Sequence, residues 1–187
     1  MKAWDAVTRD MDKDETRRYW SEQDLSHGIV SELEAVLHAS RQVAFRPHVD
    51  VTLEKDYFSG ELAERIDRFI RQYKEGRKRA KVRVDLVIHR FKQGYQVNDT
   101  KGWDIERQFE LCAELKYFKH GKFADYYIDK TENDLQRLVL MRRLGVCHES
   151  VMMVAADPDN ISARVLSDLS QLLDKWQSKL TILRREC

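Results

Sequence analysis

The chain has few of the residues that stabilise secreted and membrane proteins. Its three cysteines, Cys112, Cys147 and Cys187, form an odd set with no Cys-x-x-Cys pair, which suits a reducing cytoplasm. Cys147–His148 has no second ligand pair nearby, which argues against a zinc site. No apolar run approaches the ~20 residues of a membrane span, and the N-terminus lacks the apolar stretch of a signal peptide. We therefore expect a cytoplasmic protein without a membrane partner.

Proline and glycine are also scarce, and the charges nearly balance. Two Pro and seven Gly, with 42% hydrophobic residues, are typical of an ordinary globular chain. A net charge of +1 excludes a globally basic nucleic-acid-binding protein. The length predicts a single domain over residues 21–187, preceded by an N-terminal extension over residues 1–20.

One segment departs from this balance. Residues 74–83, KEGRKRAKVR, hold six basic residues and one acidic residue. Such a block, with Lys78, Arg79 and Lys81 at its centre, can bind the phosphates of a nucleic acid. Lys119, in the mixture of rings and charge that follows residue 116, is a further candidate. The alternative for the block is a solvated helix end and loop.

Hydrophobic periodicity predicts alternating helices and strands. Apolar residues at helical spacing indicate helices, and alternating or continuous apolar runs indicate strands. The expected helices are 21–39, 60–76, 131–144 and 160–185, and the expected strands are 48–54, 81–91, 108–118 and 150–156.

This order of elements predicts an α/β sandwich around a mixed sheet. Strands 81–91 and 108–118 should be antiparallel, and the helix at 131–144 should lead to a parallel neighbour at 150–156. The apolar face of the long final helix, 160–185, is expected to pack on the core or on a second subunit, which would make a homodimer.

Three charged residues interrupt two of these strands. Glu114 and Lys116 are two residues apart and share a strand face, and Asp85 breaks the run VRVDLVI on the preceding strand. With fourteen Glu and fourteen Lys in the chain, about one Glu-x-Lys arises by chance. The tripeptide alone therefore indicates no site, and its interpretation depends on the neighbouring strand. If the two strands pair, both carboxylates can hold Mg²⁺ while the ammonium orients an attacking water.

Asp85, a connection, Glu114–Leu115–Lys116 and a following helix resemble the PD-(D/E)XK nuclease superfamily over roughly residues 22–156. Val84 stands where the motif has its proline, as in many members. The resemblance implies a restriction-endonuclease-like sandwich with a central mixed β-sheet flanked by helices. It also implies Mg²⁺ (or Mn²⁺) as cofactor and nucleic acid as partner, DNA before RNA. Asp85 and Glu114 would be metal ligands, and Lys116 would assist the water.

The resemblance also implies a glutamate on the first core helix and a polar residue, commonly Gln, on the helix after the Glu-x-Lys strand. With Leu25 at 0° and about 100° per residue, Glu32 falls in the buried stripe and Glu34 points toward solvent. We therefore expect Glu32 to complete the metal site and to belong to the catalytic set. Gln136 is the candidate on the second helix, with Asp134 and Lys130 as neighbours and a plain surface residue as the alternative.

Other interpretations remain open. Asp85, Glu114 and Lys116 can instead form a cross-strand salt bridge in a protein that keeps the fold and binds a partner without catalysis. A third hypothesis is a component of a toxin, phage-defence or mobile-element system that acts beside a partner.

Overall fold

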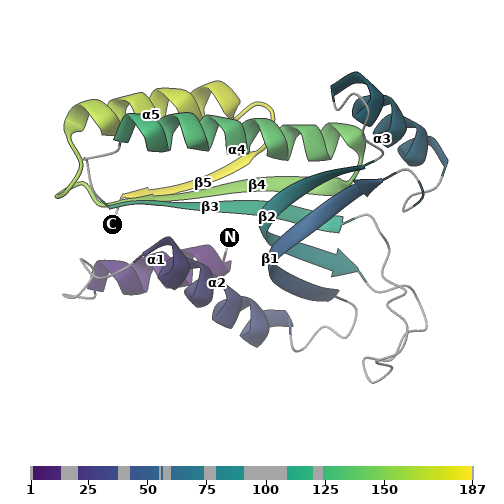
Figure 1. Cartoon of the computed structure of the whole chain (residues 1–187). Coiled ribbons are helices and arrows are strands. Elements are labelled where there is room, and N and C mark those ends of the chain that lie inside the picture. The colour runs from purple at the N-terminus through teal and green to yellow at the C-terminus, as the bar shows by residue number, and fades with distance from the viewer. Residues whose placement is uncertain are drawn as a thin grey trace.

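A five-stranded mixed sheet lies at the centre of the protein, with helices on both faces (Figure 1). The computed structural model describes residues 2–13, 21–37, 43–54, 56, 60–73, 79–90, 109–119 and 124–186. The strands lie side by side in chain order: β1 (Val43–Glu54), β2 (Arg79–Arg90), β3 (Phe109–Phe118), β4 (Cys147–Ala156) and β5 (Thr181–Glu186). The expected antiparallel pairing of β2 with β3 and parallel pairing of β3 with β4 are both confirmed, and so is the α/β class.

The helices form a layer on each face of the sheet (Figure 1). Helices α1 (Lys2–Lys13) and α2 (Glu22–Leu37) cover one face, and α4 (Ala124–Leu144) and α5 (Ala163–Trp176) cover the other. Helix α3 (Gly60–Tyr73) packs beside β1 at the far end. Two hydrophobic cores result, one on each side of the sheet.

Strand β3 is buried on both faces because it lies in the middle of the sheet. Leu115 and Tyr117 point into the core under α1 and α2, and Cys112 and Phe118 point into the core under α4 and α5. Since side chains alternate along a strand, residues 114 and 116 share the face of Cys112 and Phe118. The charged pair of β3 is thereby directed toward α4.

The end of α4 is set by a glycine. Gly145 has a φ of 83°, and the Val146 N–H donates to the Met141 carbonyl at 2.9 Å. This left-handed C-cap lets the chain turn directly into β4. The helix ends near the expected residue but begins at residue 124, seven residues earlier than its apolar pattern predicts.

The prediction of one long helix over residues 160–185 is wrong. Helix α5 begins after the Ser162 cap and ends at Trp176, and β5 follows at Thr181–Glu186. The apolar spacing of Leu180 and Leu183 imitates a helix. Parallel pairing with β4 supplies long-range hydrogen bonds to this segment, and these outweigh the local preference.

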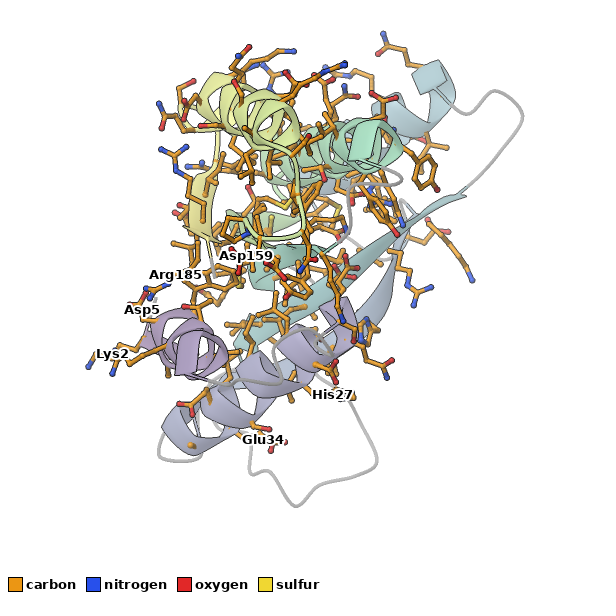
Figure 2. The ribbon with its side chains drawn as sticks, turned by 90° about the vertical axis from the view of Figure 1, so that its left-hand side faces the viewer. Lys2, Asp5, His27, Glu34, Asp159 and Arg185 are labelled. Atoms are coloured by element: carbon orange, nitrogen blue, oxygen red, sulfur yellow. The ribbon has the colours of Figure 1, made fainter. Side chains whose placement is uncertain are left out.

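Residues 1–20, expected as an extension, contain α1, whose Trp4 and Val7 are buried in the core beside α2. Gly28 makes this close approach of α1 and α2 feasible, because a Cβ at that position would lie 2.9 Å from a Val7 methyl. On the outer side of α2, Glu34 is exposed, as its helical phase predicts (Figure 2).

Candidate active site

The ladder between β2 and β3 is short where the charged residues lie. Backbone pairing joins residues 86–88 of β2 to residues 111–113 of β3. One step further, the Leu115 N–H donates to the Asp85 Oδ2 atom at 2.9 Å. The Asp85 carboxylate therefore takes the place of a backbone acceptor, which fixes its position against β3.

Glu114 lies against Asp85 from the neighbouring strand. Its side chain is 4% exposed, whereas that of Asp85 is 16% exposed. Burial, followed by the nearby charge of Asp85 and hydrogen bonding to its carboxyl group, raises the pKa of Glu114 to about 9. Glu114 is therefore mostly protonated at neutral pH.

Lys116 is the buried cation of the site. Its Nζ atom lies 3.1 Å from Asp134 Oδ2 and 3.6 Å from Glu22 Oε1, and it donates to the Leu115 carbonyl at 3.0 Å. Burial alone would lower the pKa of this ammonium group, but four surrounding carboxyl groups raise it above its ordinary value. Lys116 is therefore charged at neutral pH.

Helix α4 contributes an acid and a base that face the site. Asp134 is buried and pairs with Lys116, and one guanidinium nitrogen of Arg137, Nη2, contacts both Asp134 and Glu114 Oε1, the latter at 3.3 Å. Sequence reasoning named Asp134 and did not consider Arg137. The available signal was helical phase, because Asp134 and Arg137 share the angular position of the buried Met141.

Helix α2 contributes Glu22. Ser21 caps the helix: its Oγ atom accepts the Asp24 N–H, and the Asp24 carboxylate accepts the Ser21 N–H. This reciprocal cap places Glu22 in the first turn, where its carboxylate reaches Lys116. Burial raises the pKa of Glu22, and Lys116 opposes that rise.

The structure brings Glu22, rather than Glu32, to Lys116. Ten residues of α-helix span about 15 Å, so Glu32 lies far along α2 from this contact. Both glutamates lie in the buried stripe of α2. Glu22 precedes Leu25 by three residues, which places it at about 60° from Leu25 around the helix axis. Helical phase could therefore have identified Glu22, but it could not choose between two positions along the axis.

His48 of β1 is a further residue that sequence reasoning does not assign to the site. Among the described residues it alone combines a positive φ, of 50°, with a side chain. Its Nδ1 atom lies 3.9 Å from Asp85 Oδ1, and the side chain is 43% exposed. His48 therefore stands at the outer edge of the cluster, at a point of backbone strain.

The remaining candidates do not join this cluster. Gln136 and Lys81 are exposed, and Lys119 is half-buried at the end of β3. Lys78 lies outside the described residues, as do the side chain of Arg79 and residues 91–108 between β2 and β3. The binding role of the basic block stays a prediction.

The cluster has more acids than bases. Glu22, Asp85, Glu114 and Asp134 surround two cations, Lys116 and Arg137. Within the described part of the chain, no three His, Cys, Asp or Glu side chains form a ready metal cage. The paired carboxylates Asp85 and Glu114 still suit Mg²⁺, which commonly binds through one or two carboxylates and completes its shell with water and substrate phosphate.

A cavity of about 460 Å³ lies elsewhere, between α5 and strands β4 and β5. Leu169, Leu173 and Arg184 are among its lining residues, and the carboxylate pair is not. The carboxylate cluster and this cavity are therefore separate features.

Comparisons with known proteins were made by family, by sequence and by fold. No family model, curated protein or solved structure matches this chain. None of the described helices has the length and apolar character needed to cross a bilayer. Any function must therefore be argued from the residues themselves.

Proposed function

We propose that the protein is a divalent-metal-dependent nuclease that hydrolyses phosphodiester bonds of nucleic acid, DNA before RNA. One observation carries the proposal. Glu114, which is buried, and Asp85, which is 16% exposed, lie next to each other at the point where the β2–β3 ladder stops, with Lys116 two residues further along β3. This arrangement requires tertiary structure to bring together residues about 30 positions apart.

The order of elements supports the same proposal. An initial helix, three antiparallel strands, a crossover helix and a parallel strand appear as α2, β1, β2, β3, α4 and β4, with α3 inserted after β1. A restriction-endonuclease-like core, the finer fold that we propose, would place its Asp and Glu-x-Lys residues on the second and third of these strands.

The donor set fits a hard divalent cation. Two neighbouring carboxyl groups, in a cluster with more acids than bases, would bind Mg²⁺ or Mn²⁺ in place of the proton that Glu114 holds. Such a cation, when bound, polarises a phosphodiester and lowers the pKa of a bound water.

The chain's own residues have distinct parts in this proposal. Asp85 and Glu114 would hold the metal, and the Leu115 N–H keeps the Asp85 carboxylate oriented. Lys116 supplies an ammonium group that orients the attacking water or stabilises developing charge. Glu22 takes the part expected of Glu32, because it is the α2 carboxylate that reaches Lys116.

One observation favours a second candidate, a binding protein without catalysis. Lys116 already pairs with Glu22 and Asp134, and Arg137 pairs with Asp134, so both cations of the cluster have a counter-charge without a metal. In such a protein the same residues would serve folding and recognition only.

A cleavage assay and thermal melts separate the two candidates. Wild-type protein should cleave single- or double-stranded DNA, or RNA, in Mg²⁺ or Mn²⁺ but not in EDTA, and its melting temperature should rise with either metal. Lys116→Ala should lose cleavage while retaining the metal-dependent rise, because its ammonium acts on water and phosphate. A wild-type protein that neither cleaves nor gains stability from Mg²⁺ or Mn²⁺ would establish the non-catalytic candidate instead.

A further inference from the structure

Arg137 joins the surface of α4 to the buried carboxylates. Its Nη2 atom lies 3.3 Å from Glu114 Oε1 and also contacts Asp134 Oδ1. Its side chain is 40% exposed, whereas the side chains of Glu114 and Asp134 are 4% and 3% exposed. Arg137 is thus the cation of the cluster that solvent can reach, while Lys116 is enclosed.

The guanidinium group is not fully satisfied in this position. Among the described residues, its Nε atom is buried without a hydrogen-bond partner. A guanidinium carries five N–H donors in a fixed fork, and a site built to hold it permanently would satisfy them. The Nη2 atom contacts both Glu114 and Asp134, while the Nε–H has no partner in the described part of the chain. Attraction to these two carboxyl groups therefore accounts for the position of the Arg137 guanidinium group.

We propose that Arg137 is the internal counter-cation of the candidate active site, and that a divalent cation displaces its guanidinium group from Glu114. This inference rests on the proposed function. A metal ion on the Glu114 carboxylate would lie within a few ångströms of the guanidinium, and two positive charges at that distance repel each other. Arg137 therefore weakens metal binding, and metal binding in turn moves Arg137 away from Glu114.

Substitution of Arg137 should strengthen metal binding. By calorimetric titration with Mn²⁺, Arg137→Gln should bind about tenfold more tightly than the wild type, a change of about 1.4 kcal/mol. Arg137→Lys, which retains the charge, should bind nearly as the wild type does. The matched control is Arg143→Gln, an exposed arginine on the same helix, which removes an equal charge without a described contact to the cluster.

A second measurement uses the wild-type chain, so it does not depend on a variant that folds. The Nε–H signal of Arg137 in ¹⁵N NMR, assigned by its absence in Arg137→Lys, should shift on addition of Mg²⁺ with the midpoint of metal binding. Signals of arginines remote from the cluster, such as Arg143, should stay in place.

The outcomes distinguish this inference from the proposed function. Metal binding by the wild type, with an unmoved Arg137 signal and unchanged affinity in Arg137→Gln, would overturn the counter-cation role and leave the nuclease proposal standing. No Mn²⁺ binding by either protein would overturn the metal-dependent function, and the inference with it.

Discussion

The two edges of β3 differ sharply. Toward β4 the parallel ladder extends from Phe109 and Cys147 to Phe118 and Ala156. Toward β2 the antiparallel ladder covers residues 86–88 and then gives way to a side chain, the Asp85 carboxylate. The comparison shows that the candidate site forms where backbone pairing stops, because there the Leu115 N–H donates to a carboxylate instead of a backbone carbonyl.

The same difference appears in the neighbouring side chains. On the β4 edge, Glu114 is paired with Met152 and Lys116 with Val154, and both partners are apolar. Among the described residues, the charges that compensate Glu114 and Lys116 come from β2, α2 and α4. We expect substitutions on the β4 side to change stability alone, and substitutions on the β2 side to change metal binding or ionisation.

The strongest test compares Met152→Ala, on the β4 side of β3, with Asp85→Asn, on the β2 side. Met152 is fully buried, so its truncation should lower the free energy of unfolding by about 2–5 kcal/mol and leave the gain from Mg²⁺ unchanged. Asp85→Asn keeps an acceptor for the Leu115 N–H but loses an anionic ligand. It should abolish the metal-dependent rise in the free energy of unfolding, which for the wild type should be about 2.7 kcal/mol at a metal concentration of 100 Kd.

Urea denaturation with and without Mg²⁺ measures both variants. If Asp85→Asn retained the full metal-dependent gain, the carboxylate pair would not be the metal site. If Met152→Ala lost it, the two edges would not be functionally separate.

A second prediction concerns the buried cation. Lys116→Met should destabilise the fold by about 3 kcal/mol, because Asp134 stays buried after it loses this partner. Val154, which is paired with Lys116 on β4, is apolar and supplies no replacement charge for Asp134. The measurement is chemical denaturation followed by circular dichroism.

The matched control for Lys116→Met is Lys175→Met. Lys175 pairs with Glu132 at 2.8 Å, also from α4, but the lysine side chain is 62% exposed. Its removal should change stability by no more than about 0.5 kcal/mol, since exposed ion pairs contribute little. Equal losses in the two variants would contradict the assignment of Lys116 as a buried counter-ion.

Glu114 should make stability depend on pH. Its pKa is about 9 in the folded protein and near 4.5 when unfolded. Below pH 4.5 both states are protonated, and between about 4.5 and 9 the unfolded state loses a proton that the folded state keeps. Stability should therefore fall as pH rises through this window, by up to about 1.4 kcal/mol per pH unit.

Glu114→Gln tests this dependence, because an amide does not ionise. Its free energy of unfolding should fall less between pH 5 and pH 8 than that of the wild type. Glu110→Gln, on the same strand, should keep the wild-type slope. Identical slopes in the wild type and Glu114→Gln would show that Glu114 ionises normally.

The smallest effect on the fold is expected from the basic block. Reversal of Lys78 and Arg79 to Glu should leave stability unchanged, weaken nucleic-acid binding and lower the salt slope by roughly 0.9 for each phosphate that the protein no longer neutralises. Fluorescence anisotropy over a salt series measures this. The matched reversal at Arg142 and Arg143, which are exposed at the end of α4, should change nucleic-acid binding and its salt slope little. Equal effects of the two reversals would make the basic block an ordinary solvated surface.

Much of the fold could be predicted from local patterns. The alternation of helices and strands, the antiparallel β2–β3 pair and the parallel β4 neighbour follow from periodicity and connection length. The C-terminal segment could not, because Leu180 and Leu183 fit a helix as well as a strand. The choice depended on hydrogen bonds from β4, a segment about 30 residues earlier.

The sequence by itself determined which residue types would need partners: carboxylates at 85 and 114 and an ammonium at 116, all within apolar strands. Only the tertiary structure decided which groups would meet them. Glu22, Asp134 and Arg137 come from α2 and α4, and their reach depends on where each helix crosses the sheet. Helical phase specifies a direction around an axis, whereas charge compensation is decided by distances of a few ångströms between separate elements.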